Sequence, residues 1–229
     1  MTARPDSLNQ VAAEVVSCTA CPRLVAWREQ VAVEKRAAFA GEEYWGRPVP
    51  GFGDPAARLL VAGLAPAAHG GNRTGRVFTG DRSGDWLFAA LWRAGYANQP
   101  TSVAADDGLR LADCYVSAAV RCAPPANKPS PEERDRCLPY LGREIALLPQ
   151  LAVIVVLGRF AFDAVSRLVG VVERPRPAFG HLVEVHARHP EVTVVCSFHP
   201  SQQNTFTGKL TAPMLDAVFT RSRELTAAP

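Results

Sequence analysis

The chain has 229 residues, 48% of them hydrophobic and 21% charged, which is enough to bury a substantial core. Its longest strongly apolar run, Leu151 to Leu157, is too short to cross a bilayer, and the first residues lack the apolar stretch of a secretory signal. We therefore expect a protein of the reducing cytosol with no membrane span. The net charge is +3 and 22 of the 25 basic residues are arginine. This excess permits binding to phosphate, but a GC-rich genome also produces it.

The hydrophobic pattern predicts strands that alternate with helices. Ser7 and Gln10 have the spacing of a capping box and open a helix that should end near Cys18. Short, nearly continuous apolar runs, typical of strands buried on both faces, follow at 58–63, 114–120, 152–157 and 192–198. Helical patterns lie at 83–95 with Ser83 as cap, from Ser130 onward, at 158–170, and from about residue 211. We predict one α/β domain over residues 1–229, with a mainly parallel sheet between two helical layers.

Polar loops rich in Gly and Pro follow three of these strands, at 63–70, 121–128 and 199–204. In open parallel sheets, ligands bind beyond the carboxyl ends of the strands. The sequence therefore predicts that these loops form the functional site.

Four cysteines have spacing that fits a metal site. Cys18 and Cys21 are separated by two residues, Cys122 follows a predicted strand, and Cys137 lies in the helix that Ser130 opens. Four thiolates suit zinc and a [4Fe-4S] cluster about equally well, so the spacing leaves both open. The other two cysteines, at 114 and 196, fall inside predicted strands and are interpreted as core residues.

Three side chains in the loops are candidates for chemistry. Asp81 precedes a helix and can point into the crevice, although an ordinary turn or capping aspartate is the simpler interpretation. His199 follows a buried strand and precedes Pro200, which makes a ligand-facing imidazole plausible, while a structural role is equally common. Phe78 lies in a loop rich in Gly and Arg, where it can stack on a base or belong to the core.

Basic residues are concentrated in the same loops. This clustering favours a phosphate backbone as the partner, and a solvated charged rim is the alternative. The residues are Arg73, Arg76, Arg82, Arg121, Lys128 and Lys209.

Taken together, these motifs resemble the uracil-DNA glycosylase superfamily, and most closely its family 5, also called type b. The likeness covers nearly the whole chain. It rests on Cys18-x2-Cys21, the segment from Gly63 to Asp81, the segment from Ala119 to Pro129, Cys137, and the segment from His199 to Gly208.

The resemblance implies a central parallel sheet flanked by helices and a glycosylase that removes uracil, and other deaminated bases such as hypoxanthine, from DNA. It also implies a [4Fe-4S] cluster on Cys18, Cys21, Cys122 and Cys137, which we expect to lie away from the reactive edge and to tie down residues 1–50. Related enzymes carry an acidic residue at the position of Leu64 or Ala65. In family 5 the role of that acidic residue, which is to activate water, passes to the residue that is Asp81 here. The His-Pro-Ser-Gln-Gln motif replaces the His-Pro-Ser-Pro of several relatives.

These implications assign roles to the loop residues. Asp81 would stabilise the sugar cation or align water, and His199 would stabilise the departing base. We expect the base to be bound by Gly63, Ala65, Ala67, Phe78 and Asn127, and the DNA to be contacted by His69, Arg73, Asn204 and Lys209.

Two other classes of protein are compatible with part of the pattern. A non-catalytic nucleic-acid-binding module with a four-cysteine zinc site would use the loops only as a basic surface. A redox enzyme is disfavoured, because no G-x-G-x-x-G fingerprint follows a strand. We expect the protein to act as a monomer.

Overall fold

The computed structural model describes residues 6–188 and 190–227, which form a six-stranded sheet of order β1-β3-β2-β4-β6-β5. The four inner strands are parallel, and the two edge strands are antiparallel to their neighbours. The predicted α/β class is confirmed, while both edge strands escaped prediction. The strands are β1 (Phe52–Gly53), β2 (Leu59–Gly63), β3 (Cys114–Ala118), β4 (Val153–Leu157), β5 (Glu184–Arg188) and β6 (Glu191–Ser197).

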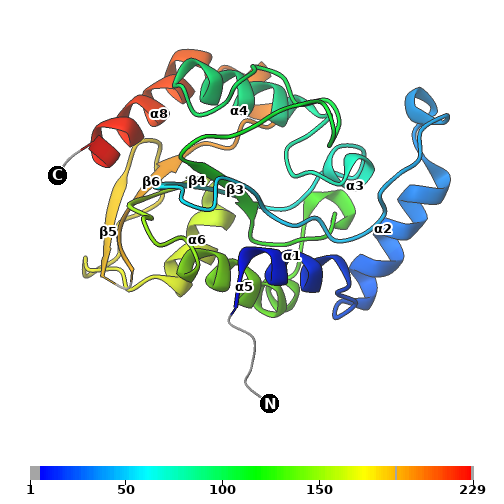
Figure 1. Cartoon of the computed structure of the whole chain (residues 1–229), viewed down its shortest axis with the longest axis horizontal. Coiled ribbons are helices and arrows are strands. Elements are labelled where there is room, and N and C mark those ends of the chain that lie inside the picture. The colour runs from blue at the N-terminus through cyan, green and yellow to red at the C-terminus, as the bar shows by residue number, and fades with distance from the viewer. Residues whose placement is uncertain (1–5, 189, 228–229) are drawn as a thin grey trace.

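Helices cover both faces of the sheet, with α4 and α8 on one side and α1, α5 and α6 on the other (Figure 1). None of the helices in the described ranges is long and apolar enough to span a membrane. The helices are α1 (Leu8–Val16), α2 (Pro22–Glu34), α3 (Gly71–Thr74), α4 (Arg82–Arg93), α5 (Pro131–Ala146), α6 (Arg159–Leu168), α7 (Gln202–Phe206) and α8 (Ala212–Ala227).

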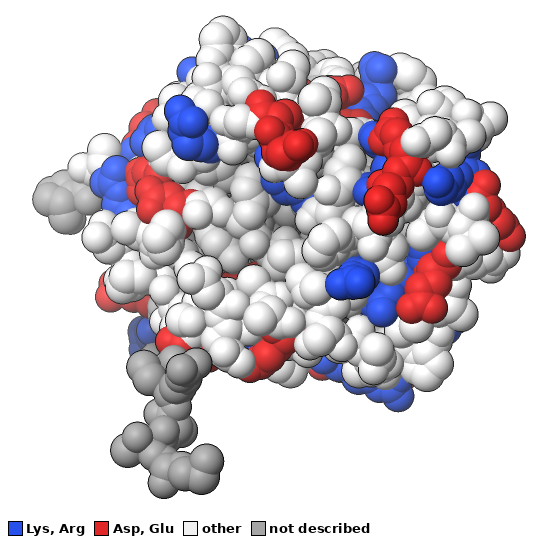
Figure 2. Space-filling model, turned by 45° about the vertical axis from the view of Figure 1, so that its right-hand side comes forward, with Lys and Arg blue, Asp and Glu red and all other residues white. Residues whose placement is uncertain are grey.

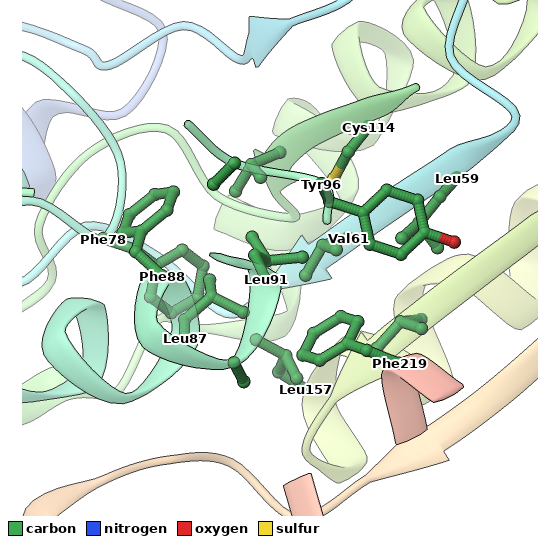
Figure 3. Close-up of a cluster of buried hydrophobic side chains, with 14 of the residues drawn as sticks. Leu59, Val61, Phe78, Leu87, Phe88, Leu91, Tyr96, Cys114, Leu157 and Phe219 are labelled. Carbon is green, nitrogen blue, oxygen red and sulfur yellow. The ribbon is translucent and has the colours of Figure 1, made fainter. Parts of the chain in front are cut away.

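The core consists of two hydrophobic layers that share the sheet. Successive side chains of a strand point to opposite faces, so Leu59 and Val61 pack toward α4 and α8 while Leu60 and Ala62 pack toward α5 and α6. Figure 3 shows the first layer, in which Phe219 of α8 lies among residues of the sheet and α4. Cys114 and Cys196 are fully buried in these layers, as predicted.

The helix caps differ in part from the predicted ones. Asp81, and not Ser83, caps α4, because its side chain accepts a hydrogen bond from the Gly84 amide. Ser7 caps α1 through the Gln10 amide, but the Gln10 side chain donates to Glu14 and does not complete a capping box. The capping box predicted at Ser130 is present, with Glu133 as its partner.

The helix α2 was not predicted, and it lies beside the sheet near α3 (Figure 1). Pro22 at its first turn fits a helix start, and the buried residues Leu24, Arg28 and Val31 follow at helical spacing. An arginine on the buried stripe weakens the amphipathic pattern, which explains why sequence inspection missed this helix.

Candidate active site and cysteine centre

Phe78 and His199, from loops after two different strands, lie side by side. Their ring centroids are 6.0 Å apart with the planes inclined by 33°. The Phe78 ring also lies against Gly63 at the end of β2, where a methyl group would come within 2.5 Å of its Cζ atom. Gly63 therefore leaves the space that the aromatic ring fills. Phe78 is at one end of the hydrophobic cluster in Figure 3, so its ring belongs to both the core and the site.

The backbone at Phe78 is held in an unusual conformation. Its φ of 55° is in the left-handed region, which costs free energy for a residue with a side chain. The carbonyl oxygen of Phe78 lies where a methyl group on Gly84 would come within 1.9 Å, so the glycine of α4 permits the close approach. The local packing thus fixes the position of the ring.

His199 is partly buried at the carboxyl end of β6. Burial lowers the pKa of His199 to about 4, so its imidazole is neutral near neutral pH. The carbonyl of His199 accepts a hydrogen bond of 2.9 Å from the side-chain amide of Asn204. Asn204 was predicted to contact DNA, but the structure uses its amide nitrogen to fix the backbone of His199.

Asp81 has one carboxylate oxygen that is satisfied by the protein and one that is not used in the cap. Its Oδ1 accepts from the Gly84 amide at 3.0 Å. Its Oδ2 faces Gly70 of the loop after β2, where a methyl group would come within 2.1 Å. Burial raises the pKa of Asp81 above the usual carboxyl value, and the Gly84 and Ser83 amides oppose the shift. The capping role that the sequence allowed is thus real, and it is compatible with a role in chemistry.

The remaining predicted base-binding residues occupy different positions around these three side chains. Ala67 lies in the loop after β2, where its carbonyl accepts from the amides of Gly70 and Asn72. Ala65 packs instead against a small cluster that contains Cys122. Asn127 is exposed and has a left-handed φ of 56°. Its contact with the base stays a prediction.

Three arginines predicted to form a basic rim are turned into the protein. The side chains of Arg73, Arg76 and Arg121 are 9%, 8% and 2% exposed. They pair in that order with Glu42, Asp107 and Glu144. The expected basic rim is wrong in this respect, because each of these charges is already compensated by a carboxylate. Figure 2 shows acidic and basic side chains intermixed on the face that it displays.

Other cations do remain exposed near the site. Arg82, next to Asp81, places its guanidinium 4.3 Å from the ring centroid of Phe206, which is 64% exposed at the end of α7. Lys209 is exposed, with its Nζ 5.0 Å from the ring centroid of Phe198. The predicted DNA contact His69 is partly buried, and its Nδ1 is 3.1 Å from the Tyr44 hydroxyl. Sequence inspection missed Phe206, although an aromatic residue in a polar loop was a usable signal.

Four cysteine side chains line one cavity beside this loop cluster, namely Cys18, Cys21, Cys122 and Cys137. Burial raises the pKa of Cys21, Cys122 and Cys137, and the last reaches about 12. The cavity was expected to lie away from the reactive edge. Ala65 of the loop after β2 packs against the cluster of Leu24, Val120 and Cys122 beside this cavity, and the separation of the cavity from the reactive edge stays a prediction.

Hydrogen-bond donors contact two of the four sulfurs. Arg28 Nη1 donates to Cys122 at 3.1 Å, and the backbone amide of Arg121 donates to Cys137 at 3.3 Å. Arg136 and Tyr140 line the same cavity. Donors of this kind stabilise thiolates in preference to thiols. Among residues 6–188 and 190–227, no three His, Cys, Asp or Glu side chains meet closely enough to hold a single metal ion.

The fold and the site agree with the comparison to known families. The chain matches the model of the uracil DNA glycosylase superfamily over residues 50–221. It is 54% identical over 220 residues to the type-5 uracil-DNA glycosylase of Mycobacterium bovis, with 96% of this chain and 82% of the relative covered. The chain therefore belongs to the uracil-DNA glycosylase superfamily.

Within the superfamily, the relatives named type 5 match the chain better than those named type 4. The type-5 enzyme of Thermus thermophilus is 49% identical over 213 residues, which cover 92% of this chain and 94% of the relative. The type-4 enzyme of Archaeoglobus fulgidus is 32% identical over 159 residues, which cover 67% of this chain and 70% of the relative. The resemblance to family 5 expected from the motifs is confirmed.

Proposed function

We propose that the protein excises uracil from DNA by hydrolysing the bond between the base and the deoxyribose. The observation that carries this proposal is the contact of Phe78 with Gly63 and His199, with Asp81 three residues further along the same loop. An aromatic platform, a neutral imidazole and a carboxylate are the groups that this reaction requires. The relatives named uracil-DNA glycosylase support the same activity.

The substrate base must leave the helical stack to reach this site. Extrusion of a nucleotide costs a few kcal/mol, and it costs less at a mispaired uracil. The exposed ring of Phe206, at the end of the short helix α7 that follows His199, lies beside Arg82. This ring can fill the space that the extruded base leaves. Phe78 then stacks on the base while Asn127 and the amides near Ala67 bind its polar edge.

The reaction breaks the bond between C1′ and N1, and the electron pair stays with the uracil nitrogen. The neutral imidazole of His199 donates a hydrogen bond to the uracil anion as its charge develops. The carboxylate of Asp81 faces the cationic sugar, or aligns the water whose oxygen adds to C1′. The water proton passes to the carboxylate or to solvent, and the uracil nitrogen later takes a proton from solvent. The products are free uracil and an abasic site.

Removal of other deaminated bases, hypoxanthine in particular, is a further part of the proposal. The loop that follows Gly63, the residue against the Phe78 ring, carries Ala67 and Ala68. Small side chains there leave room for a purine, which larger residues would fill.

The four thiols are proposed to hold a [4Fe-4S] cluster. Cys18, Cys21, Cys122 and Cys137 line one cavity, and two of them, Cys122 and Cys137, accept hydrogen bonds from an arginine side chain and a backbone amide. Four thiolates with such donors fit an iron-sulfur cluster, whose sulfur ligands are commonly hydrogen-bonded. The cluster would tie residues 1–50 to the loops after β2 and β3. The single-domain organisation, the monomeric state and the cytoplasmic location stay proposals with it.

The activity is tested by alkaline cleavage of a labelled duplex that contains one uracil or one hypoxanthine. The protein should produce strand breaks at the uracil, and Asp81→Asn should reduce them to a low residual level while still capping α4, because Asn is also a good N-cap residue. The matched control is Asp85→Asn, a change on the first turn of the same helix. Full excision by the Asp81→Asn variant would contradict the assigned role, and no excision by the cluster-loaded protein would favour the binding-module alternative.

A further inference from the structure

Arg28 of α2 is a buried cation whose electrostatic partner is not a buried carboxylate. Its side chain is 4% exposed, and its nearest carboxylate among the described residues belongs to Glu29, at 3.7 Å, with a side chain that is 60% exposed. By contrast, the buried Arg76 and Arg121 each face a buried carboxylate. The Nε of Arg28 is also buried and has no hydrogen-bond partner in the part of the chain that the structure describes. An uncompensated buried charge is costly, so a nearby anion is expected.

Arg28 points toward the cysteine centre, which is where such an anion would lie. Its Nη1 is 3.1 Å from the Cys122 sulfur and 3.3 Å from the Cys18 carbonyl. Both residues line the four-thiol cavity, as does Arg28 itself. We propose that Arg28 is the internal counter-ion of the anionic group that the four thiols hold, and that α2 transmits the occupancy of this centre to the base-binding loop. The inference rests on the proposed cluster.

A chain of hydrogen bonds joins Arg28 to the loop after β2. The carbonyl of Arg28 accepts a bond of 3.1 Å from the side-chain amide of Asn72, which is fully buried. The backbone amide of Asn72 donates to the Ala67 carbonyl at 3.0 Å. Ala67 in turn accepts from Gly70, whose Cα lies against the Asp81 carboxylate. Asn72 therefore connects the helix of the cysteine centre with the loop that borders the site.

This arrangement predicts different behaviour with and without the cluster. When the cluster is bound, its negative charge compensates Arg28 and thereby stabilises the docking of α2 against the cysteine centre. When the cluster is removed, the guanidinium is left buried without that anion. The docking of α2 should then weaken, and the residues that Asn72 ties to it should become less ordered. Asn72 is thus a positioning residue, because it acts through the loop.

The role of Arg28 is tested by the retention of the cluster. Arg28→Met keeps most of the unbranched stem of the side chain and removes its charge. The variant should lose visible absorbance and bound iron to a chelator about tenfold faster than the unaltered protein, as expected for a partner of metal ligands. The matched control is Arg23→Met on the same helix, whose arginine is already paired with Glu133. It should retain the cluster nearly as long as the unaltered protein.

The outcomes separate this inference from the proposal on which it rests. If the unaltered protein, purified without oxygen, contains no iron and no acid-labile sulfide, the proposed cofactor is wrong and the inference fails with it. If the unaltered protein contains the cluster and Arg28→Met retains it equally long, only the counter-ion role is wrong.

The link through Asn72 is tested by amide hydrogen exchange of residues 64–75 in loaded and chelator-stripped protein. Stripping should raise exchange in this loop and leave the buried strand β4 unchanged. Asn72→Leu has the same branched shape and number of side-chain heavy atoms, and it removes the amide donor. The Oδ1 atom that it also removes has no hydrogen-bond partner among the described residues. In this variant the exchange of the loop should no longer depend on loading, while circular dichroism confirms that the protein is folded. Loading-dependent protection equal to that of the unaltered protein would refute the link. Asn72→Ala serves in the same way if the leucine variant does not fold.

Discussion

The ring of Phe78 lies against the Cα of Gly63, so close that a methyl group on the glycine would be 2.5 Å from the ring. Gly63→Ala should therefore displace the ring from its place beside His199. Because small misplacements at a reacting centre are costly, we expect the single-turnover rate of uracil excision to fall about 100-fold. The control is Gly41→Ala, where an added methyl group meets nothing within 4 Å. A Gly63→Ala variant that is folded and fully active would show that the ring position is not critical.

The pH dependence of excision should reflect Asp81 and not His199. Burial raises the pKa of Asp81, so its carboxylate is lost at a higher pH than an ordinary one as the solution is acidified. Burial lowers the pKa of His199 to about 4, so its imidazole is neutral near neutral pH. The single-turnover rate should thus fall as the pH drops through the raised carboxyl pKa, and the residual rate of Asp81→Asn should lack this limb. Asp85→Asn should keep it. A limb that survives in Asp81→Asn would assign the titration to another group.

Asn204 should affect catalysis through the backbone of His199. Asn204→Ala removes the bond of 2.9 Å to the His199 carbonyl. We expect the maximal rate to fall about tenfold with little change in the substrate concentration for half-maximal rate, because the loss concerns the position of a reacting group. Gln203→Ala, at an exposed neighbouring position of α7, is the control. A change confined to substrate affinity would instead support the predicted DNA contact.

Phe206 should contribute to the binding of duplex DNA. Its ring is 64% exposed and held beside Arg82. Phe206→Ala should weaken the binding of a duplex that contains an abasic site by about 1–3 kcal/mol, the range of aromatic stacking on bases. Single-stranded substrate should be less affected, since no partner strand has to be separated. Fluorescence anisotropy measures both. Equal losses on the two substrates would argue against insertion into the duplex.

The buried pair of Arg121 and Glu144 should dominate stability beneath the cysteine centre. The hydroxyl of Ser117 donates to the same carboxylate at 2.6 Å. Glu144→Gln leaves the guanidinium without its anion, and we expect a loss of about 3–5 kcal/mol in the free energy of unfolding. Asp216→Asn, which breaks the exposed pair with Arg93, should cost less than about 1 kcal/mol. Urea titration of both variants checks the contrast, and similar losses would refute it.

The sequence predicted the parallel part of the sheet because each inner strand is a continuous apolar run. The edge strand β1 has two residues and β5 alternates buried with exposed positions, so neither stands out as a buried run. The helix α2 was missed because Arg28 interrupts the stripe of apolar residues that it buries.

The site was predicted less completely than the fold. Its loops could be located, because they follow strands whose carboxyl ends meet at one edge. Whether an arginine in such a loop points outward depends on a carboxylate that is distant in the sequence. Glu42 lies 31 residues before Arg73, and Glu144 lies 23 residues after Arg121. No local pattern reveals these pairs, which is why the predicted basic rim was partly wrong.

The carboxylate of Asp81 starts a helix with one oxygen and leaves the other for the reaction. Selection for a stable protein and selection for repair therefore act on the same side chain. Most replacements at this position lose both the cap and the charge, while asparagine or serine keeps the cap and gives up the charge. A lineage that no longer needed the activity would still retain an N-cap residue at this position, because the start of α4 depends on it.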